Sequence, residues 1–331
     1  MSAGSSETNR LGALDALRGL AAVWVAMYHF SYNWQSEYQF PTAGLLTWVA
    51  QYGYLAVQLF FVISGFVIPF SLDRSKYQSS PAQYGRFLTK RIFRLHPLFL
   101  INVAVCSFVM TLPAGWSDIW PHFFYLNDVM GRNWYLQIYW TLALEIQYAI
   151  AIPLIFPLLI HPRKWVRWAT LAAFLSTALL VKSSVWFPHY AGFYALGMLV
   201  FWKFTKRENW IGLLLGLAAC TYIILQTHGT THLTLGLLTV AVILIGRGGG
   251  RFFTWLAEIS YAMYLFHILV GHRILAHAVK QPRHLWADTG WVLLAIAASL
   301  AAAWVIHRFI EMPIHRLTSS LLARKPAVRQ P

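Results

Sequence analysis

The chain has 331 residues, of which 58% are hydrophobic and only 11% are charged, and its formal net charge is +15. A soluble globular protein carries about 25% charged residues, so this composition excludes that class. The apolar residues gather in runs of about 20, the length of a helix that crosses a bilayer. They do not alternate as the strands of a membrane β-barrel do. The sequence therefore predicts an all-α, polytopic membrane helical bundle.

About ten transmembrane helices are expected, with both termini cytoplasmic. With this topology 21 of the 26 Lys and Arg residues fall on the inner side and 5 on the outer side, as the positive-inside rule expects. The charge then faces the anionic inner leaflet, so no nucleic acid is needed as a partner. Residues 1–10 are expected to form a disordered tail, 11–316 the membrane domain and 317–331 a basic tail. The predicted spans are 13–32, 44–70, 92–112, 134–160, 165–181, 185–202, 210–226, 231–246, 252–271 and 289–310.

The first span, LDALRGLAAVWVAMYHF at 14–30, carries Asp15, Arg18 and His29 among apolar residues. Arg18 and His29 are eleven positions apart, so they share one helix face and are separated by about 16 Å along the axis. Taken singly, Arg18 fits an inner anchor and His29 an outer aromatic belt. Taken together they form a polar track, and ionisable groups within membrane helices usually mark a site.

The third span begins with RFLTKRIFRLHPLFL at 86–100, where Arg86, Lys90 and Arg94 share one helix face and Arg91 stands beside them. One interpretation is a basic stop at the inner membrane surface. The other is a clamp for the phosphates of a nucleotide-containing donor such as coenzyme A, because guanidinium groups bind phosphate through paired hydrogen bonds.

The fourth span places Glu145 near the middle of the membrane, in WTLALEIQY at 140–148. A carboxylate at this depth costs a few kcal/mol unless it is paired. An ion pair with Arg18 or with another arginine is one interpretation, but a purely structural buried pair rarely repays its desolvation. We therefore expect Glu145 to belong to a functional site.

Cysteine and histidine spacing indicates neither a disulfide framework nor a metal site. Cys106 and Cys220 both lie within apolar spans, and the thirteen histidines show no HExxH pattern. His228 and His232 fall at predicted loop positions and are expected to be solvated or interfacial. We expect no metal and no tightly bound cofactor.

Five segments, taken in chain order, resemble the acyltransferase-3 family of integral membrane O-acyltransferases over about residues 11–315. The departures are Thr141 where serine is commonest, Gln58 where an acidic residue is common, and Ile146 in place of a frequent glutamate. The segments are LDALRGLAAVWVAMYHF with its Arg-x10-His spacing, VQLFFVISGFVI (57–68), RIFRLHP (91–97), WTLALEIQY, and ISYAMYLFH (259–267) followed by IEMP (310–313).

The resemblance implies transfer of an acyl group, usually acetyl, from acyl-CoA as co-substrate to a hydroxyl of a carbohydrate acceptor. Surface polysaccharide, lipopolysaccharide, an oligosaccharide or a lipid-linked glycan are the acceptors implied, in a bacterial inner membrane. His29 is then the general base, since imidazole suits that role near neutral pH, and Glu145 orients it. Direct transfer and an acyl-histidine intermediate both stay open.

The resemblance also implies which residues contact the substrates. Arg18 would hold a phosphate or polarise the thioester carbonyl, and Arg91 and Arg94 would bind the phosphates of CoA. The remaining expected contacts are Ser64, Trp140, Tyr264 and His267. For Ser64, a contact between helices through a small residue is an equally good alternative. For Tyr264 and His267, a role in packing alone is an equally good alternative. Glu311 and Pro313 are expected to be structural.

A second class of protein fits the same composition. A secondary transporter, or a flippase of a glycan or lipid, also places Arg, Glu and His within membrane helices, but it typically shows paired broken helices in two inverted halves. Pro153 and Pro157 could break the fourth span, yet the second half has no matching pair.

Overall fold

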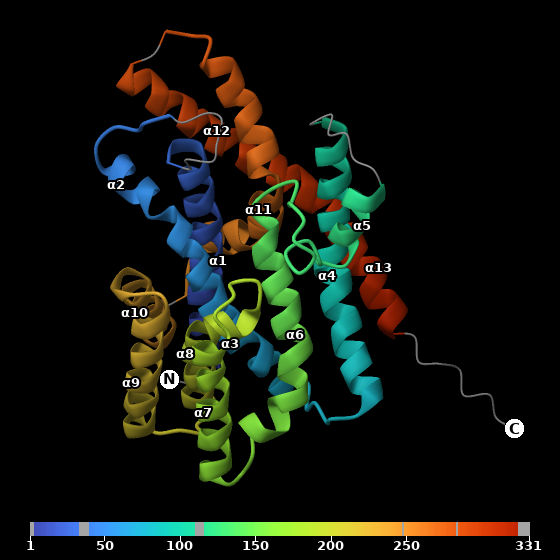
Figure 1. The fold of residues 1–331 in the computed structure, drawn as a ribbon, viewed down its shortest axis with the longest axis vertical. Coiled ribbons are helices and arrows are strands. Elements are labelled where there is room, and N and C mark those ends of the chain that lie inside the picture. Colours follow the sequence, from blue (N-terminus) through green and yellow to red (C-terminus); the bar gives the residue numbers. More distant parts are fainter. Residues whose placement is uncertain (1–2, 33–39, 110–115, 247, 283, 324–331) are drawn as a thin grey trace, which may run out of the picture.

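The chain folds into a helical bundle, in agreement with the composition. The computed structural model describes residues 3–32, 40–109, 116–246, 248–282 and 284–323, and in these ranges every regular element is a helix. In Figure 1 the α3–α4, α6–α7 and α8–α9 connections lie at the lower end, and the α11–α12 connection lies at the upper end. The elements are α1 (Ala3–Ser31), α2 (Leu45–Gln51), η1 (Gly53–Leu55), α3 (Ala56–Arg74), α4 (Pro81–Val109), α5 (Trp116–Phe123), α6 (Tyr139–Leu159), α7 (Lys164–Leu180), η2 (Phe187–Tyr190), α8 (Ala191–Phe204), α9 (Trp210–Thr227), α10 (Thr230–Ile245), α11 (Arg251–Ala278), α12 (Leu285–Ile306), η3 (His307–Glu311) and α13 (Met312–Ala323).

Six stretches of the described chain are long and apolar enough to cross a membrane, so the expected number of about ten is not confirmed. The other expected spans correspond to α1 and to three short helices: α7, α8 and α10 have 17, 14 and 16 residues. A crossing helix needs about 20 apolar residues, and the apolar run of α1 is interrupted by charged and polar side chains. The six stretches are Gly53–Arg74, Pro81–Val109, Tyr139–Leu159, Trp210–Thr227, Arg251–Ala278 and Leu285–Thr318.

Several boundaries differ from those expected. The run at 44–70 is not one helix, because α2 ends at Gln51 and the chain continues through η1 into α3. A side chain on Gly53 would collide with the backbone carbonyl of Trp24, so the break lies where the chain passes closest to α1. α1 begins at Ala3, inside the expected N-terminal tail, and α13 continues into the expected C-terminal tail. Residues 324–331 lie outside the described residues.

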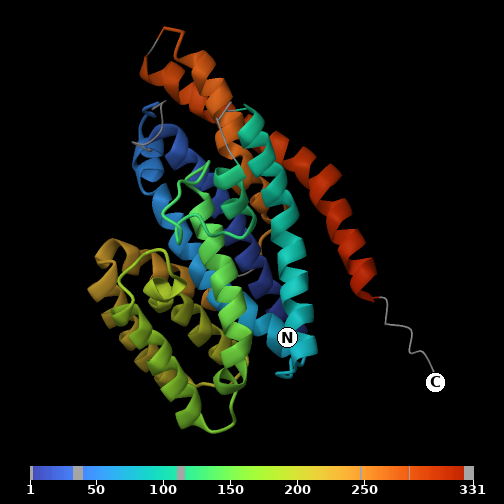
Figure 2. The same ribbon diagram turned by 45° about the vertical axis from the view of Figure 1, so that its right-hand side comes forward.

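Two close helix pairs form the centre of the bundle: α1 lies along α11, and α3 lies along α8. Glycines permit both contacts. A side chain on Gly65 of α3 would collide with the carbonyl of Tyr194, and one on Gly197 of α8 would collide with the carbonyl of Val62. In Figure 2 the continuous segment made of α12, η3 and α13 crosses the bundle at an angle. Within it, α12 packs on α11 and α13 packs on α4.

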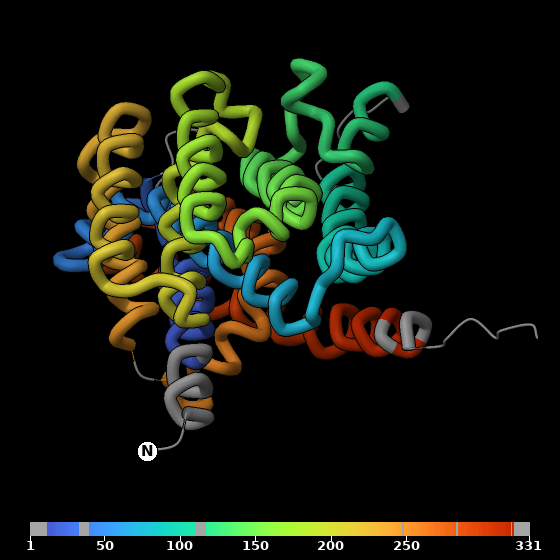
Figure 3. Tube along the Cα trace, turned by 90° about the horizontal axis from the view of Figure 1, so that it is seen from below, coloured from blue at the N-terminus to red at the C-terminus, as the bar shows by residue number. Residues whose placement is uncertain are grey.

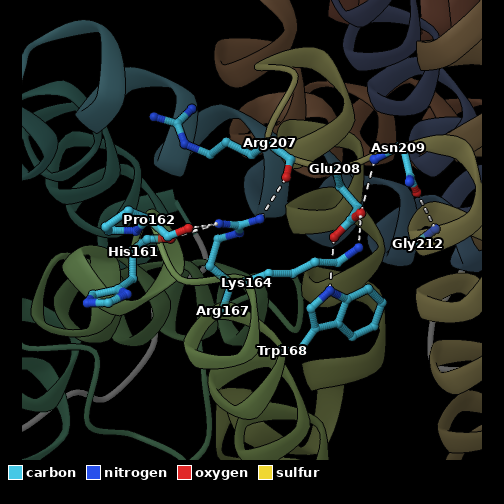
Figure 4. Close-up of polar contacts among 9 residues, drawn as sticks. All are labelled: His161, Pro162, Lys164, Arg167, Trp168, Arg207, Glu208, Asn209 and Gly212. Atoms are coloured by element: carbon cyan, nitrogen blue, oxygen red, sulfur yellow. Dashed lines mark hydrogen bonds and ion pairs between the residues drawn. The ribbon is translucent and has the colours of Figure 1, made fainter.

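The lower end of the bundle is held by a polar network between α7 and the α8–α9 connection (Figure 4). The buried carboxylate of Glu208 accepts hydrogen bonds from Lys164 Nζ at 2.8 Å, Trp168 Nε1 at 2.9 Å and its neighbouring backbone N–H at 3.0 Å. Arg167 donates to the carbonyls of His161 at 2.8 Å and Arg207 at 2.8 Å. These bonds tie the beginning of α7 to the connection between α8 and α9.

Replacing either packing glycine should loosen the α3–α8 pair. We expect Gly65→Ala and Gly197→Ala each to destabilise the protein by about 1–3 kcal/mol, the usual cost of overpacking, and to lower the unfolding temperature in detergent. Gly85 of α4 is the matched control, because no atom lies within 4 Å of a side chain added there. Gly85→Ala should leave the unfolding temperature unchanged or raise it. Equal behaviour of all three variants would contradict the close contact.

The Glu208 network should make stability depend on pH. Burial alone would raise the pKa of Glu208, but the hydrogen bonds from Lys164, Asn209 and Trp168 outweigh it and lower the pKa below 4.5. A carboxyl group whose pKa is lower in the folded protein than in the unfolded chain stabilises the folded protein at pH values above its unfolded pKa. This stabilisation is lost as the pH falls through the folded pKa.

Glu208→Gln should therefore cost about 1–3 kcal/mol at pH 7, and the difference from the wild type should shrink below about pH 4. Unfolding followed by tryptophan fluorescence at several pH values measures this. Asp118→Asn is the control, because the Asp118–Arg132 pair is half exposed at both ends and such pairs contribute little. If the loss of stability in Glu208→Gln does not change with pH, the carboxylate is excluded as the source of that loss.

Candidate active site

A cavity of about 430 Å³ lies among α1, α3, α4, α6, α11 and the η3–α13 segment. Figure 3 shows the bundle from below, with the red η3–α13 segment running sideways across the view. The cavity lining is unusual for a membrane bundle because it combines apolar side chains with many ionisable ones. Its polar and ionisable members are Asp15, Arg18, Ser64, Arg91, Arg94, Thr141, Glu145, Thr254, Glu258, Ser260, Tyr261, Tyr264, His307, Glu311 and His315.

Glu145 is paired inside this cavity, with Arg91. Arg91 Nη2 lies 2.5 Å from Glu145 Oε1, and both side chains are mostly buried. The pair joins the middle of α4 to α6. Arg91 Nε is buried and has no hydrogen-bond partner, so one face of this guanidinium still has a donor to offer. The ion-pair interpretation of Glu145 therefore holds, with Arg91 as the partner and Arg18 as a more distant charge.

Arg18 and Arg94 face the same cavity but are not bonded to a carboxylate. Among the described residues neither guanidinium makes an ion pair or a side-chain hydrogen bond. Each lies within electrostatic range of Glu145, Glu311 and Arg91. Three arginines from two helices thus converge on one space, and two of them have free donors. A polyanion that entered the cavity would find guanidinium groups ready to bind it.

Tyr264 also lines the cavity, together with Ser64 and Thr141. The Tyr264 hydroxyl is 2.6 Å from Thr141 Oγ1, and it lies 3.0 Å from the carbonyl of Ile138, to which it donates. Thr141, which stands where the family commonly has serine, therefore keeps the hydroxyl function. Ser64 faces the cavity from α3 while its neighbour Gly65 packs on α8.

Three of the expected site residues lie outside the cavity lining. Trp140 packs against Phe61 and Tyr190, with ring centroids 6.4 and 5.9 Å away. His29 and His267 contact each other, with ring centroids 5.2 Å apart. The structure thus brings together Arg18, Arg91, Arg94, Ser64, Glu145 and Tyr264 in one place and His29 with His267 in another.

The two groups meet at Tyr264. Its ring contacts that of His267 at 6.3 Å, and His267 stands one helical turn further along α11. Tyr264 also lines the cavity. The histidine pair therefore adjoins the cavity across a single tyrosine, and the expected partnership of His29 with Glu145 stays a prediction.

A His–Glu–His cluster in the cavity wall was not foreseen as part of a site. Glu311, which was expected to be structural, is buried; His307 Nδ1 lies 2.9 Å from its Oε2 and His315 Nε2 lies 3.8 Å from its Oε1. These residues occupy a π-helical turn and the helix that follows it, a feature often found at functional sites. The sequence does contain a pattern that could have identified this cluster: the spacing HxxxExxxH puts all three residues on one helix face.

The histidines expected at loop positions are less exposed than predicted. His232 lies within α10, and the ring of His228 is 4.8 Å from that of His189 and 5.9 Å from that of His232. Burial, reinforced by these two neighbouring imidazoles, lowers the pKa of His228 to about 4. His228 is therefore neutral at pH 7. In the described part of the chain, no group of three His, Cys, Asp or Glu residues is placed to hold a metal ion.

Comparison with known proteins identifies a family and several relatives. The family model described as "Acyltransferase domain" matches residues 11–308. The chain is 24% identical to Nodulation protein 10 of Rhizobium leguminosarum bv. viciae, with 95% of this chain and 96% of that protein covered. It is 24% identical to Acyltransferase MdmB of Streptomyces mycarofaciens, with 97% and 95% covered.

A third relative is much longer than the chain. O-acetyltransferase OatA of Staphylococcus aureus is 26% identical over 52% of this chain but only 29% of its own length. No solved structure matches the chain. Since the family model covers most of the sequence, including every cavity residue named above except Glu311 and His315, the chain belongs to the acyltransferase-3 family of membrane acyltransferases.

Proposed function

We propose that this protein transfers an acyl group, most simply acetyl, from acyl-CoA to a hydroxyl of a carbohydrate acceptor. The observation that carries the proposal is the convergence of Arg18, Arg91 and Arg94 on one cavity in a chain of this family. Acceptors of the proposed class are surface polysaccharides, lipopolysaccharide and lipid-linked or free oligosaccharides. The relative OatA is named an O-acetyltransferase, which supports the acetyl group and the ester product proposed here.

In this proposal the cavity takes the donor. CoA carries three phosphate groups, and Arg94 and Arg18 offer guanidinium donors that no carboxylate occupies. Arg91 is held by Glu145 but keeps a buried, unpartnered N–H. The acyl-pantetheine arm would extend past the arginines toward Ser64 and Tyr264, whose hydroxyls suit a thioester carbonyl. Acyl-CoA acts as a co-substrate here and not as a resident cofactor.

His29 is the proposed general base. The acceptor O–H loses its proton to the imidazole, the oxygen forms a bond to the thioester carbon, and the carbon–sulfur bond breaks. The CoA thiolate leaves and takes the proton back from the imidazolium, so the enzyme is regenerated. A covalent acyl-histidine would use the same residue as nucleophile. In this proposal Glu145 holds Arg91 in place through their ion pair. A contact between Glu145 and His29 stays a prediction.

We also propose a membrane topology and a cellular location for this protein. About ten helices cross a bacterial cytoplasmic membrane, α1, α7, α8 and α10 among them, and both termini are cytoplasmic. The basic loops gathered with Arg167 and Arg207 at the lower end (Figure 1) support an inner face there, because Lys and Arg are retained on the cytoplasmic side. Acyl-CoA would then enter from the cytoplasm, and His29 would lie toward the outer half.

The competing function is transport of a glycan or lipid, and an ionisable cavity is compatible with it. The two are separated by one assay on the purified protein. An acyltransferase releases free CoA thiol from acetyl-CoA in proportion to added acceptor; a transporter does not. The acceptor is then identified by mass spectrometry of surface glycans from a strain lacking the gene, where an acetyl ester should be missing.

Removing the proposed base should abolish transfer without preventing insertion. We expect His29→Ala to reduce turnover by at least about 100-fold, the lower end of what a general base contributes, while acetyl-CoA still binds. His277→Ala is the control, because His277 is an exposed histidine on α11. Thiol release and acetyl-CoA binding are measured on both variants. Wild-type turnover in His29→Ala would exclude His29 as the base.

Removing Arg94 should weaken binding of the nucleotide part of the donor. We expect Arg94→Ala to raise the KM for acetyl-CoA by about 10- to 100-fold, the equivalent of one or two charge-assisted hydrogen bonds. The KM for S-acetylpantetheine, which lacks the nucleotide, should change little. Arg132→Ala, at an exposed ion pair, is the control. An equal loss with both donors would argue against phosphate recognition by Arg94.

A further inference from the structure

The arginines that line the cavity lie in its lower part. A side chain added to Gly19 of α1 would meet Leu256 of α11, so Arg18, the residue before Gly19, lies level with the beginning of α11. That end of α11 is the lower one, because the α11–α12 connection lies at the upper end of the bundle (Figure 1). Arg91 and Arg94 are within electrostatic range of Arg18. The guanidinium groups of the cavity are therefore gathered near this level.

The cavity continues upward from the arginines to an uncharged end. Tyr264 of α11 stands eight residues beyond Leu256, which is about 12 Å along the helix axis. α3 and α6 run downward, since the α3–α4 and α6–α7 connections lie at the lower end, so their first lining residues are the highest. These are Val57 and Phe60 on α3 and Thr141 and Leu142 on α6. We call these four residues and Tyr264 the upper pocket; three of its side chains are apolar and two carry a hydroxyl.

Phe60 is the largest side chain on the face of α3 that lines the cavity. Val57, Phe60, Ser64 and Val67 all line the cavity and are all partly exposed. They stand three, four and three positions apart, which is the spacing of one helix face. A phenyl ring among two valines and a serine therefore limits the room in the upper pocket. Removing that ring would leave a space that the surroundings close only in part.

Hydrogen bonds hold the wall opposite Phe60 in place. The Tyr264 hydroxyl lies 2.6 Å from Thr141 Oγ1 and donates to the carbonyl of Ile138 at 3.0 Å. The ring of Phe60 meets that of Tyr264 edge to face, with centroids 6.1 Å apart and planes at 75°, an arrangement that aromatic pairs favour. Side chains from α3, α6 and α11 thus meet in the upper pocket. Such packing accommodates an additional methylene only at a cost.

We propose that Phe60 sets the length of the acyl group that the protein accepts, and that the donor is an acyl-CoA with a short chain, acetyl before propionyl. The inference rests on the proposed function, in which the arginines hold the nucleotide and the thioester lies near Ser64 and Tyr264. The acyl chain then points into the upper pocket between α3 and α6, whereas His29 and His267 belong to α1 and α11. A longer chain needs the space that the ring of Phe60 occupies.

The uncharged lining of the upper pocket adds a second restriction on the acyl group. Its five side chains carry no positive charge, so the distal carboxylate of a succinyl group would be buried there without a counter-charge. The level of Arg18 is about 12 Å below Tyr264 along α11. The pocket therefore selects an acyl group that is both short and apolar.

A binding experiment tests this inference without any acceptor. Tritiated acetyl-CoA is bound to the purified full chain in detergent and displaced by acetyl-, butyryl-, hexanoyl- or succinyl-CoA, or by free CoA. For the wild type, we expect hexanoyl-CoA to bind at least about 10-fold more weakly than acetyl-CoA, because each excess methylene is penalised in a filled pocket. Succinyl-CoA should bind no more tightly than free CoA.

Phe60→Ala should reverse the preference for chain length. Each methylene that becomes buried in the opened pocket adds about 4-fold in affinity, so the ratio of the Kd for hexanoyl-CoA to that for acetyl-CoA should fall by about 10- to 100-fold. Phe60→Trp should change the ratio in the opposite direction, with butyryl-CoA losing affinity relative to acetyl-CoA. Succinyl-CoA should gain nothing in either variant. If Phe60→Ala does not accumulate, Phe60→Leu replaces it, with a smaller shift in the same direction.

Phe70→Ala is the matched control, because it removes the same ring from the same helix. Phe70 stacks on Phe66, with ring centroids 5.4 Å apart, and is not among the residues that line the cavity. Its ratio of Kd values should stay within about 2-fold of the wild type. The Kd for free CoA should stay within about 2-fold in every variant, since the arginines are unchanged.

The outcomes separate the role of Phe60 from the proposed function. If Phe60→Ala still binds free CoA but keeps the wild-type ratio, or if Phe70→Ala shifts the ratio equally, the role of Phe60 is overturned. A wild type that binds hexanoyl-CoA as tightly as acetyl-CoA would likewise overturn the short-chain preference. A wild type that binds neither acetyl-CoA nor free CoA would instead contradict the proposed donor, and with it the proposed function. Opposite shifts in Phe60→Ala and Phe60→Trp support both.

Discussion

The ion pair between Arg91 and Glu145 is the constraint on which the cavity depends. Two charges in the interior of a membrane bundle are costly to desolvate unless each is paired with the other. Their pairing at 2.5 Å ties α4 to α6 and neutralises the carboxylate. As a consequence, Arg18 and Arg94 have no bonded counter-charge among the described residues, and the cavity retains a capacity for anions.

The second organising feature is α11, which serves both parts of the site. Tyr264 faces the cavity, and His267, one turn further along, contacts His29 on α1. The long contact between α1 and α11 therefore sets the distance between the donor cavity and the proposed base.

Glycine contacts and the Glu208 network hold this arrangement from outside the site. Gly65 and Gly197 let α3 and α8 approach until backbone meets backbone, and Ser64, the residue before Gly65 on α3, lines the cavity. The network of Lys164, Trp168 and Glu208 anchors the short helices at the lower end. The ionisable groups of the cavity come from α1, α4, α6, α11 and the η3–α13 segment.

The sequence by itself determined the class of fold, the family and several of the residues that gather in the cavity. Apolar runs are a local property, and Arg18, Arg91, Arg94 and Glu145 are conspicuous because charge is expensive within them. Partnerships between helices are not local: which arginine pairs with Glu145, and which histidine adjoins His29, depend on the rotation of each helix about its axis. The number of crossing helices is not confirmed for a related reason, since α7, α8 and α10 are apolar but shorter than the usual length of a crossing helix. Only the tertiary structure decided that Glu311 faces the cavity and that His267 meets His29, because packing between helices distant in the chain sets those contacts.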